Sequence, residues 1–189
     1  MASEGPNNAG TGADDAGFGT PVWTDPGNIT GASDISSASV VLAAAGNSHY
    51  LKATNFGFAI PAGATIDGIV VEWRKSKLLG GTVIDARVRI VKGGAVGSTD
   101  KASGDQWLDS LTYASYGSSS DLWGETWTIT DINASDFGAV LAANGDTGGG
   151  TGYVEHMRIT VYYTTPGSPP SPARMTRPPD RPTDPTFIE

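Results

Sequence analysis

The sequence predicts an all-β domain, an antiparallel β-sandwich of jelly-roll-like type with about eight strands and an extended arm at each end. Three observations lead to this fold class. Apolar and polar residues alternate in several segments, clusters of Gly, Asn, Asp and Ser separate these segments at short intervals, and prolines gather near the C-terminus. Alternation places one face of a strand in a core and the other in water. Short strands at regular spacing are typical of sandwiches and barrels.

The clearest alternation lies in segments 69–74, 84–90 and 153–163. Segment 84–90, for example, interleaves apolar residues with charged ones, so we expect Asp85, Arg87 and Arg89 to face water. The side chains that the three patterns place in the core are Ile69, Val71, Trp73, Ile84, Val88, Ile90, Ile159 and Val161.

Five further segments show weaker strand patterns, and one short segment favours a helix. A single helical turn is expected after residue 129, with Thr130 or Asp131 as its N-cap and Gly138 as its stop. Such a turn serves as a connector. The weaker strands are expected at 39–43, 49–54, 56–60, 126–129 and 138–142.

Residues 1–22 are expected to form an N-terminal arm, so that the sandwich domain begins at Trp23 and covers 23–163. The arm consists mostly of Gly, Ala, Asn and Asp, with Phe18 as its one bulky group near the end. A segment with so little apolar surface is not expected to offset the entropy lost when it becomes ordered. Phe18 is therefore a candidate contact to a partner.

Residues 164–189 are expected to form a second, proline-rich arm that reaches a neighbouring molecule. This segment holds eight of the chain's twelve prolines, and proline favours an extended chain without backbone donors. Its tip restores apolar side chains at Phe187 and Ile188, which would anchor the arm. The basic residues expected to help against acidic partner surfaces are Arg174, Arg177 and Arg181. A flexible linker is the alternative interpretation.

Composition excludes several classes of function. The chain has no cysteine, which removes disulfides and thiol chemistry, and a net charge of −8, which disfavours nucleic acid as a partner. The first residues lack the features of a secretion signal, and no apolar run is long enough for a membrane span. We expect synthesis in the cytoplasm and no membrane partner.

Catalytic, metal and cofactor sites are expected to be absent. His49 and His156 fall in predicted strands without a third ligand at metal-binding spacing. The glycine-rich segment 145–152 lacks the Lys-Ser/Thr ending of a phosphate loop and leads into a strand. We interpret it as a hairpin loop.

A cluster of aromatic residues leaves two interpretations open. Exposed Trp and Tyr rings are used by sugar-binding modules, because an aromatic face packs against the apolar face of a pyranose. The same residue types also fill sandwich cores. Trp107, Tyr113 and Tyr116 are the candidates for carbohydrate binding.

Three segments resemble β-sandwich proteins of tailed bacteriophages and prophage-like regions. The resemblance is found in residues 55–69, in 121–124 with Trp127, and in 131–138. It extends over roughly 23–164 and supplies no catalytic residue. What it implies is a virion surface component: a capsid decoration protein, or an accessory of the head fibre or tail.

Three functions are consistent with these observations. The first is a non-enzymatic decoration or cement protein whose arms bind the major capsid protein, other virion subunits or neighbouring copies. A homotrimer on the virion surface is the geometry that the resemblance implies for it. The second is a carbohydrate- or receptor-binding accessory module, and the third is an extracellular filament subunit assembled by strand addition.

Overall fold

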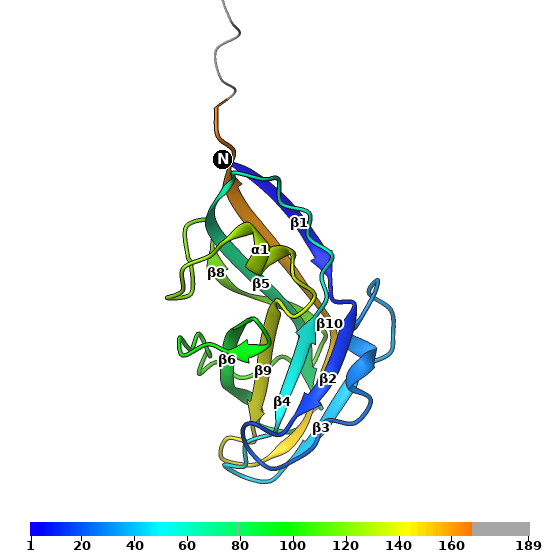
Figure 1. The fold of residues 1–189 in the computed structure, drawn as a ribbon. Helices are drawn as coiled ribbons and strands as arrows, with labels where there is room; N and C mark the ends of the chain where they lie inside the picture. The colour runs from blue at the N-terminus through cyan, green and yellow to red at the C-terminus, as the bar shows by residue number, and fades with distance from the viewer. Residues whose placement is uncertain (79, 168–189) are drawn as a thin grey trace, which may run out of the picture.

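The computed structural model describes residues 1–78 and 80–167 and shows two antiparallel β-sheets packed on one another (Figure 1). The predicted β-sandwich is confirmed, and apart from β7 successive strands alternate between the sheets. The elements are β1 (Ala2–Asn8), β2 (Thr11–Asp15), η1 (Pro26–Ile29), β3 (Ala38–Leu42), β4 (Tyr50–Thr54), β5 (Thr65–Lys77), β6 (Ile84–Lys92), β7 (Ala95–Val96), β8 (Thr112–Ser118), α1 (Ile129–Asn133), β9 (Gly138–Asn144) and β10 (Gly150–Thr164).

The first sheet, sheet A, is built around the long strand β10. Along its length β10 pairs with β5, and β5 in turn pairs with β8, which is an edge strand. The other side of β10 is shared by two strands. β1 pairs with the half that ends at Thr164, and β3 pairs with the half that begins at Gly150.

The second sheet, sheet B, has the order β2-β4-β9-β6-β7. Strand β9 is its buried centre, since residues 138–143 are all buried. β7 contains two residues and pairs only with the end of β6. Most of the outer edge of β6 therefore has no strand partner in the sheet, and this edge is where the candidate site lies.

The core between the sheets contains most of the side chains that alternation places there. Trp73 of β5 pairs with Met157 of β10, and both are fully buried. The predicted core positions that are fully buried are Ile69, Val71, Trp73, Val88, Ile90, Ile159 and Val161. A period of two is thus sufficient to orient β5, β10 and the second half of β6.

The first half of β6 departs from the prediction because it contains a β-bulge. The pairing with β9 shifts register between Asp85 and Arg87, and an extra residue in a strand reverses the phase of the alternation. Asp85 therefore points into the sandwich and is 5% exposed, whereas Ile84 is only partly buried. The prediction that Asp85 faces water and Ile84 lies inside was wrong.

The prediction of an N-terminal arm was also wrong, because residues 2–15 form two strands of the domain. β1 joins sheet A and β2 joins sheet B, as Figure 1 shows at one side of the sandwich. Edge strands are held by backbone hydrogen bonds and need few apolar side chains. For this reason the low content of apolar residues in this segment did not indicate that it forms strands.

Three other predicted elements differ from the structure. Segment 56–60 is not a strand, although Phe56 and Phe58 are buried and pack against Phe137. Segment 126–129 leads into α1 instead of forming a strand. The helix begins earlier than predicted, because its N-cap is Thr128, in a capping box with Asp131, and not Thr130 or Asp131.

We predict that Gly12→Ala destabilises the protein. Gly12 lies against η1, where a Cβ atom would stand 2.2 Å from the carbonyl oxygen of Pro26. We expect a loss of about 1–3 kcal/mol in the free energy of unfolding, measured by urea denaturation. Gly27→Ala is the control, since a Cβ there meets open space. Equal free energies of unfolding for the two variants would mean that β2 does not pack against η1.

Candidate functional site

A loop of residues 97–111, which we call the covering loop, closes the open edge of sheet B and forms one wall of a pocket. It runs along β6 and donates hydrogen bonds to backbone carbonyls of that strand and of the residue just before it. The backbone N–H of Lys101 donates to the carbonyl of Val88 at 2.9 Å, and that of Trp107 donates to the carbonyl of Val83 at 2.8 Å. An edge that would otherwise be unpaired is thereby covered.

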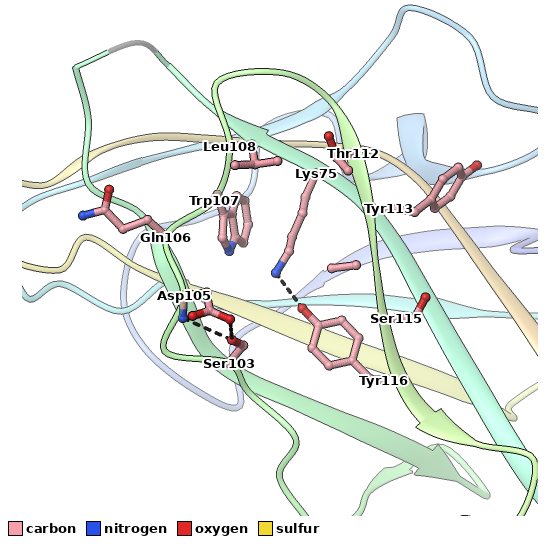
Figure 2. Close-up of a pocket in the computed structure, with 11 residues that line it drawn as sticks. Lys75, Ser103, Asp105, Gln106, Trp107, Leu108, Thr112, Tyr113, Ser115 and Tyr116 are labelled. Atoms are coloured by element: carbon pink, nitrogen blue, oxygen red, sulfur yellow. Dashed lines mark hydrogen bonds between the residues drawn. The ribbon is translucent and has the colours of Figure 1, made fainter.

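The pocket lies between the covering loop and β8 and has a volume of about 250 Å³ (Figure 2). Its rim carries exposed polar side chains together with one exposed apolar side chain, Leu108, which is 57% exposed. Its floor consists of buried side chains, Lys75, Trp107 and Tyr116. The polar rim residues include Asp105, Gln106, Thr112 and Ser115.

The structure brings together the three aromatic residues that the sequence marked for carbohydrate binding. Trp107, Tyr113 and Tyr116 all line the pocket. Two of them are floor residues, however, because Trp107 is 3% exposed and Tyr116 is 7% exposed. Tyr113 is half-buried at the edge. The aromatic rings therefore form a floor and a side wall and do not form an open platform.

Asp85 lies beneath this floor and holds it together, a role that the sequence did not reveal. Its Oδ1 accepts hydrogen bonds from Lys75 Nζ and, at 2.8 Å, from Trp107 Nε1. Its Oδ2 accepts from the hydroxyl of Tyr116 at 2.6 Å and from the backbone N–H of Ser103 at 3.1 Å. Asp85 points inward because of the bulge, so a prediction that assumes regular alternation could not place this side chain in the interior.

Lys75 crosses the floor and contacts each of its other members. Its Nζ donates to the hydroxyl of Tyr116 at 2.6 Å and lies 4.7 Å from the ring centre of Trp107. Figure 2 shows the amine and the phenol pointing at one another. Burial lowers the pKa of Lys75 and outweighs the neighbouring Asp85 charge, which acts in the opposite direction. Burial also raises the pKa of Tyr116, and Asp85 adds to that shift.

On the outer face of sheet A, Tyr113 connects the pocket to a second polar cluster. Its hydroxyl lies 2.6 Å from Nδ1 of His156. The other ring nitrogen, Nε2, lies 3.0 Å from the carbonyl oxygen of Gly31 and 3.0 Å from Oδ1 of Asn8. Since a carbonyl only accepts, Nε2 carries the proton and Nδ1 of the neutral ring accepts from Tyr113. Arg158 covers the Tyr113 ring at 4.0 Å.

The two histidines have separate partners. His49 is paired with Asp14 at 2.7 Å, and His156 contacts Tyr113, Asn8 and Gly31. Among the residues that the structure describes, no group of three or more His, Cys, Asp or Glu side chains could hold a metal ion. No helix in the same residues is long and apolar enough to cross a membrane.

Of the residues assigned to assembly, only Phe18 lies in the described part of the chain. Its ring stacks on Tyr50 at 5.4 Å, with the guanidinium of Arg87 at 5.0 Å. Phe18 thus packs on its own domain. The remaining candidates lie outside the described residues: Arg174, Arg177, Arg181, Phe187 and Ile188.

Comparison with known proteins yields no match to a family profile and no match among curated proteins. Among solved structures, one similar chain is the second N-terminal cellulose-binding domain of β-1,4-glucanase C from Cellulomonas fimi. It is 15% identical over 84% of this chain and 94% of that chain, with a TM-score of 0.47.

Two further solved structures show lower scores. The CBM22-1 xylan-binding domain of Xyn10C from Paenibacillus barcinonensis is 10% identical, covering 85% of this chain and 92% of that chain, with a TM-score of 0.40. A CBM4 structure is 15% identical, covering 70% and 89%, with a TM-score of 0.36. Likeness at this level carries no conclusion about function.

We predict that His156→Gln reduces the loss of stability on mild acidification. Burial lowers the pKa of His156 from 6.5, and Arg158 and Arg74 act in the same direction, while the Gly31 carbonyl and Glu155 oppose the shift. As the pH falls, His156 of the unfolded chain therefore binds a proton before His156 of the folded protein does. The free energy of unfolding that the neutral His156 contributes is fully present above pH 6.5 and is lost as the pH falls toward the folded-state pKa. Gln can retain hydrogen bonds but does not titrate in this range.

The measurement is urea denaturation at several pH values from about 7 to about 5, with the wild type and the variant in parallel. The difference in unfolding free energy between the two proteins should narrow as the pH falls. A constant difference across this range would contradict the assignment of a neutral, buried His156.

Proposed function

We propose that this protein is a non-catalytic carbohydrate-binding module whose ligand occupies the pocket between the covering loop and β8. The observation that carries the proposal is the composition of the pocket wall. Exposed polar side chains and an exposed leucine surround a floor of aromatic rings. A concave site with an apolar lining and a few convergent polar groups is the usual form of a small-ligand site.

This lining suits the two surfaces of a sugar ring. The hydroxyl groups at the ring's periphery need donors and acceptors, which Gln106 and Asp105 supply from the loop. The C–H groups on the ring's faces need apolar contact, for which Leu108 and Tyr113 are placed on the two walls. The volume of about 250 Å³ is small for a drug-sized ligand and suits one sugar unit of a chain.

The arrangement supports binding without hydrolysis. A glycosidase of the usual kind needs two carboxyl groups on opposite sides of the scissile bond. Among the described residues that line the pocket, Asp105 is the one carboxylate. Asp85 lies beneath the floor with four hydrogen-bond donors directed at it, so it is committed to the structure.

The virion setting stays a prediction of the sequence resemblance. Capsid decoration, a homotrimer and a place on the virion surface are what the resemblance implies, and most of the arm residues expected to attach the protein lie outside the described part of the chain. A carbohydrate-binding module is compatible with that setting, since a tail or head-fibre accessory would use it to bind a cell-surface glycan.

We predict that Leu108→Ala and Gln106→Ala each weaken carbohydrate binding by roughly tenfold, which corresponds to about 1.4 kcal/mol. Both side chains are exposed, so their removal should leave the melting temperature unchanged. The measurement is titration calorimetry with a panel of neutral oligosaccharides that includes cello- and xylo-oligosaccharides. Leu78→Ala is the matched control, because Leu78 is 55% exposed and does not line the pocket.

Failure can take two forms. If no oligosaccharide on the panel or on a broad glycan array binds the wild-type protein, the proposed function is wrong. If a glycan binds and all three variants retain its affinity, carbohydrate binding stands and the pocket is the wrong site.

A further inference from the structure

The amine of Lys75, in the floor of the pocket, is held against the carboxyl group of Asp85 beneath it. Lys75 extends from β5 of sheet A and is 7% exposed, and Asp85 extends from β6 of sheet B with a fully buried side chain. The Nζ of Lys75 donates to Oδ1 of Asp85. The pair is one of two direct polar links that Asp85 makes to the other sheet at this edge of the sandwich, and the second is the hydrogen bond from Tyr116 of β8.

As an ion pair, this contact is costly. Two charges taken out of water lose their hydration, and their mutual attraction repays the loss only in part. An amide between Nζ of Lys75 and Cγ of Asp85 would remove both charges and keep the two side chains in contact. The surrounding groups therefore decide whether such a bond can form.

We propose that Lys75 and Asp85 are joined by an intramolecular isopeptide bond. The Nζ atom of Lys75 attacks Cγ of Asp85, the new N–C bond forms, and the bond from Cγ to Oδ2 breaks. Oδ2 leaves as water with two protons from the ammonium group. An ammonium and a carboxylate contain all the atoms of an amide and a water molecule, so the step needs no oxidant, cofactor or other reactant.

Tyr116 is placed to move the proton that this step requires. Its hydroxyl accepts from Lys75 Nζ at 2.6 Å and donates to Oδ2 of Asp85 at 2.6 Å. A proton can therefore pass from the nucleophile through the phenol to the leaving oxygen. Transfer by a positioned side chain of this kind is general acid–base catalysis.

Trp107 is placed to stabilise the charge that develops on the other oxygen. When Nζ attacks, negative charge collects on Oδ1, and the indole Nε1–H of Trp107 already donates to this atom at 2.8 Å. A fixed donor aimed at a developing oxyanion lowers the barrier of acyl transfer. Both oxygens of Asp85 thus have partners suited to their separate roles.

The protonation states favoured by burial agree with these roles. Burial lowers the pKa of Lys75, which favours the neutral amine that acts as nucleophile. Burial raises the pKa of Tyr116, which keeps the phenol protonated and able to donate. Two reactants held in contact by a folded core also avoid the entropy cost of meeting.

The pocket provides the way out for water. Lys75 and Tyr116 both line it, and it opens between β8 and the covering loop. Water released at Oδ2 can leave through this opening.

The test is the intact mass of the purified full-length chain under denaturing conditions. We expect a mass lower than that of the sequence by one water molecule. Digestion with trypsin should yield residues 75–77 joined to residues 78–87 through the side chains of Lys75 and Asp85, because a modified Lys75 resists cleavage. Tandem mass spectrometry of this branched peptide locates the bond. The full mass, with the two peptides separate, would overturn the proposal.

Two variants separate the isopeptide bond from other reactions that lose water. Lys75→Met should have its full mass, whereas a cyclic imide formed by Asp85 alone would still lose water in this variant and would overturn the proposal. Asp85→Asn should lose ammonia in place of water and reach the same final mass as the wild type. If either variant fails to fold, the branched peptide of the wild type decides the question.

Discussion

The carboxylate of Asp85 is the contact on which this edge of the molecule depends. It extends from sheet B and binds one residue of β5, one of β8 and two of the covering loop. Elsewhere in the described residues the two sheets pack through apolar side chains, and the hydrophobic effect that holds them together has no preferred direction. Within residues 1–78 and 80–167, Asp85 is the one side chain that brings strands of both sheets and a loop to one point by directed bonds.

The pocket is a consequence of how the edge of β6 is covered. A free edge strand invites pairing with another chain, and here a loop fills that place in the absence of a longer β7. A loop follows the edge less closely than a strand does. The space left between this loop and β8 is the pocket, so the loop that protects the edge also forms the candidate binding surface.

Regular strands could be predicted from the sequence, and irregular ones could not. Alternation located the core faces of β5 and β10, because those faces carry large apolar side chains such as Trp73 and Ile159. It failed at Asp85, since a bulge changes the phase without any local signal. It also failed for β1 and β2, which are held by backbone bonds that composition does not reveal. The aromatic residues of the site were found, whereas the carboxylate that orders them was not.

Stability and the proposed binding depend on the same residues, and this limits which substitutions can separate the two. Lys75, Trp107 and Tyr116 are at once the floor of the pocket and the ligands of a buried carboxylate. Removing any of them leaves a buried polar group without its partner, which costs stability whether or not a ligand is bound. Only the exposed rim, represented by Gln106 and Leu108, can be altered without touching the core. A floor fixed in this way is ordered in the free protein, so that binding of the proposed ligand would not have to spend free energy on ordering it.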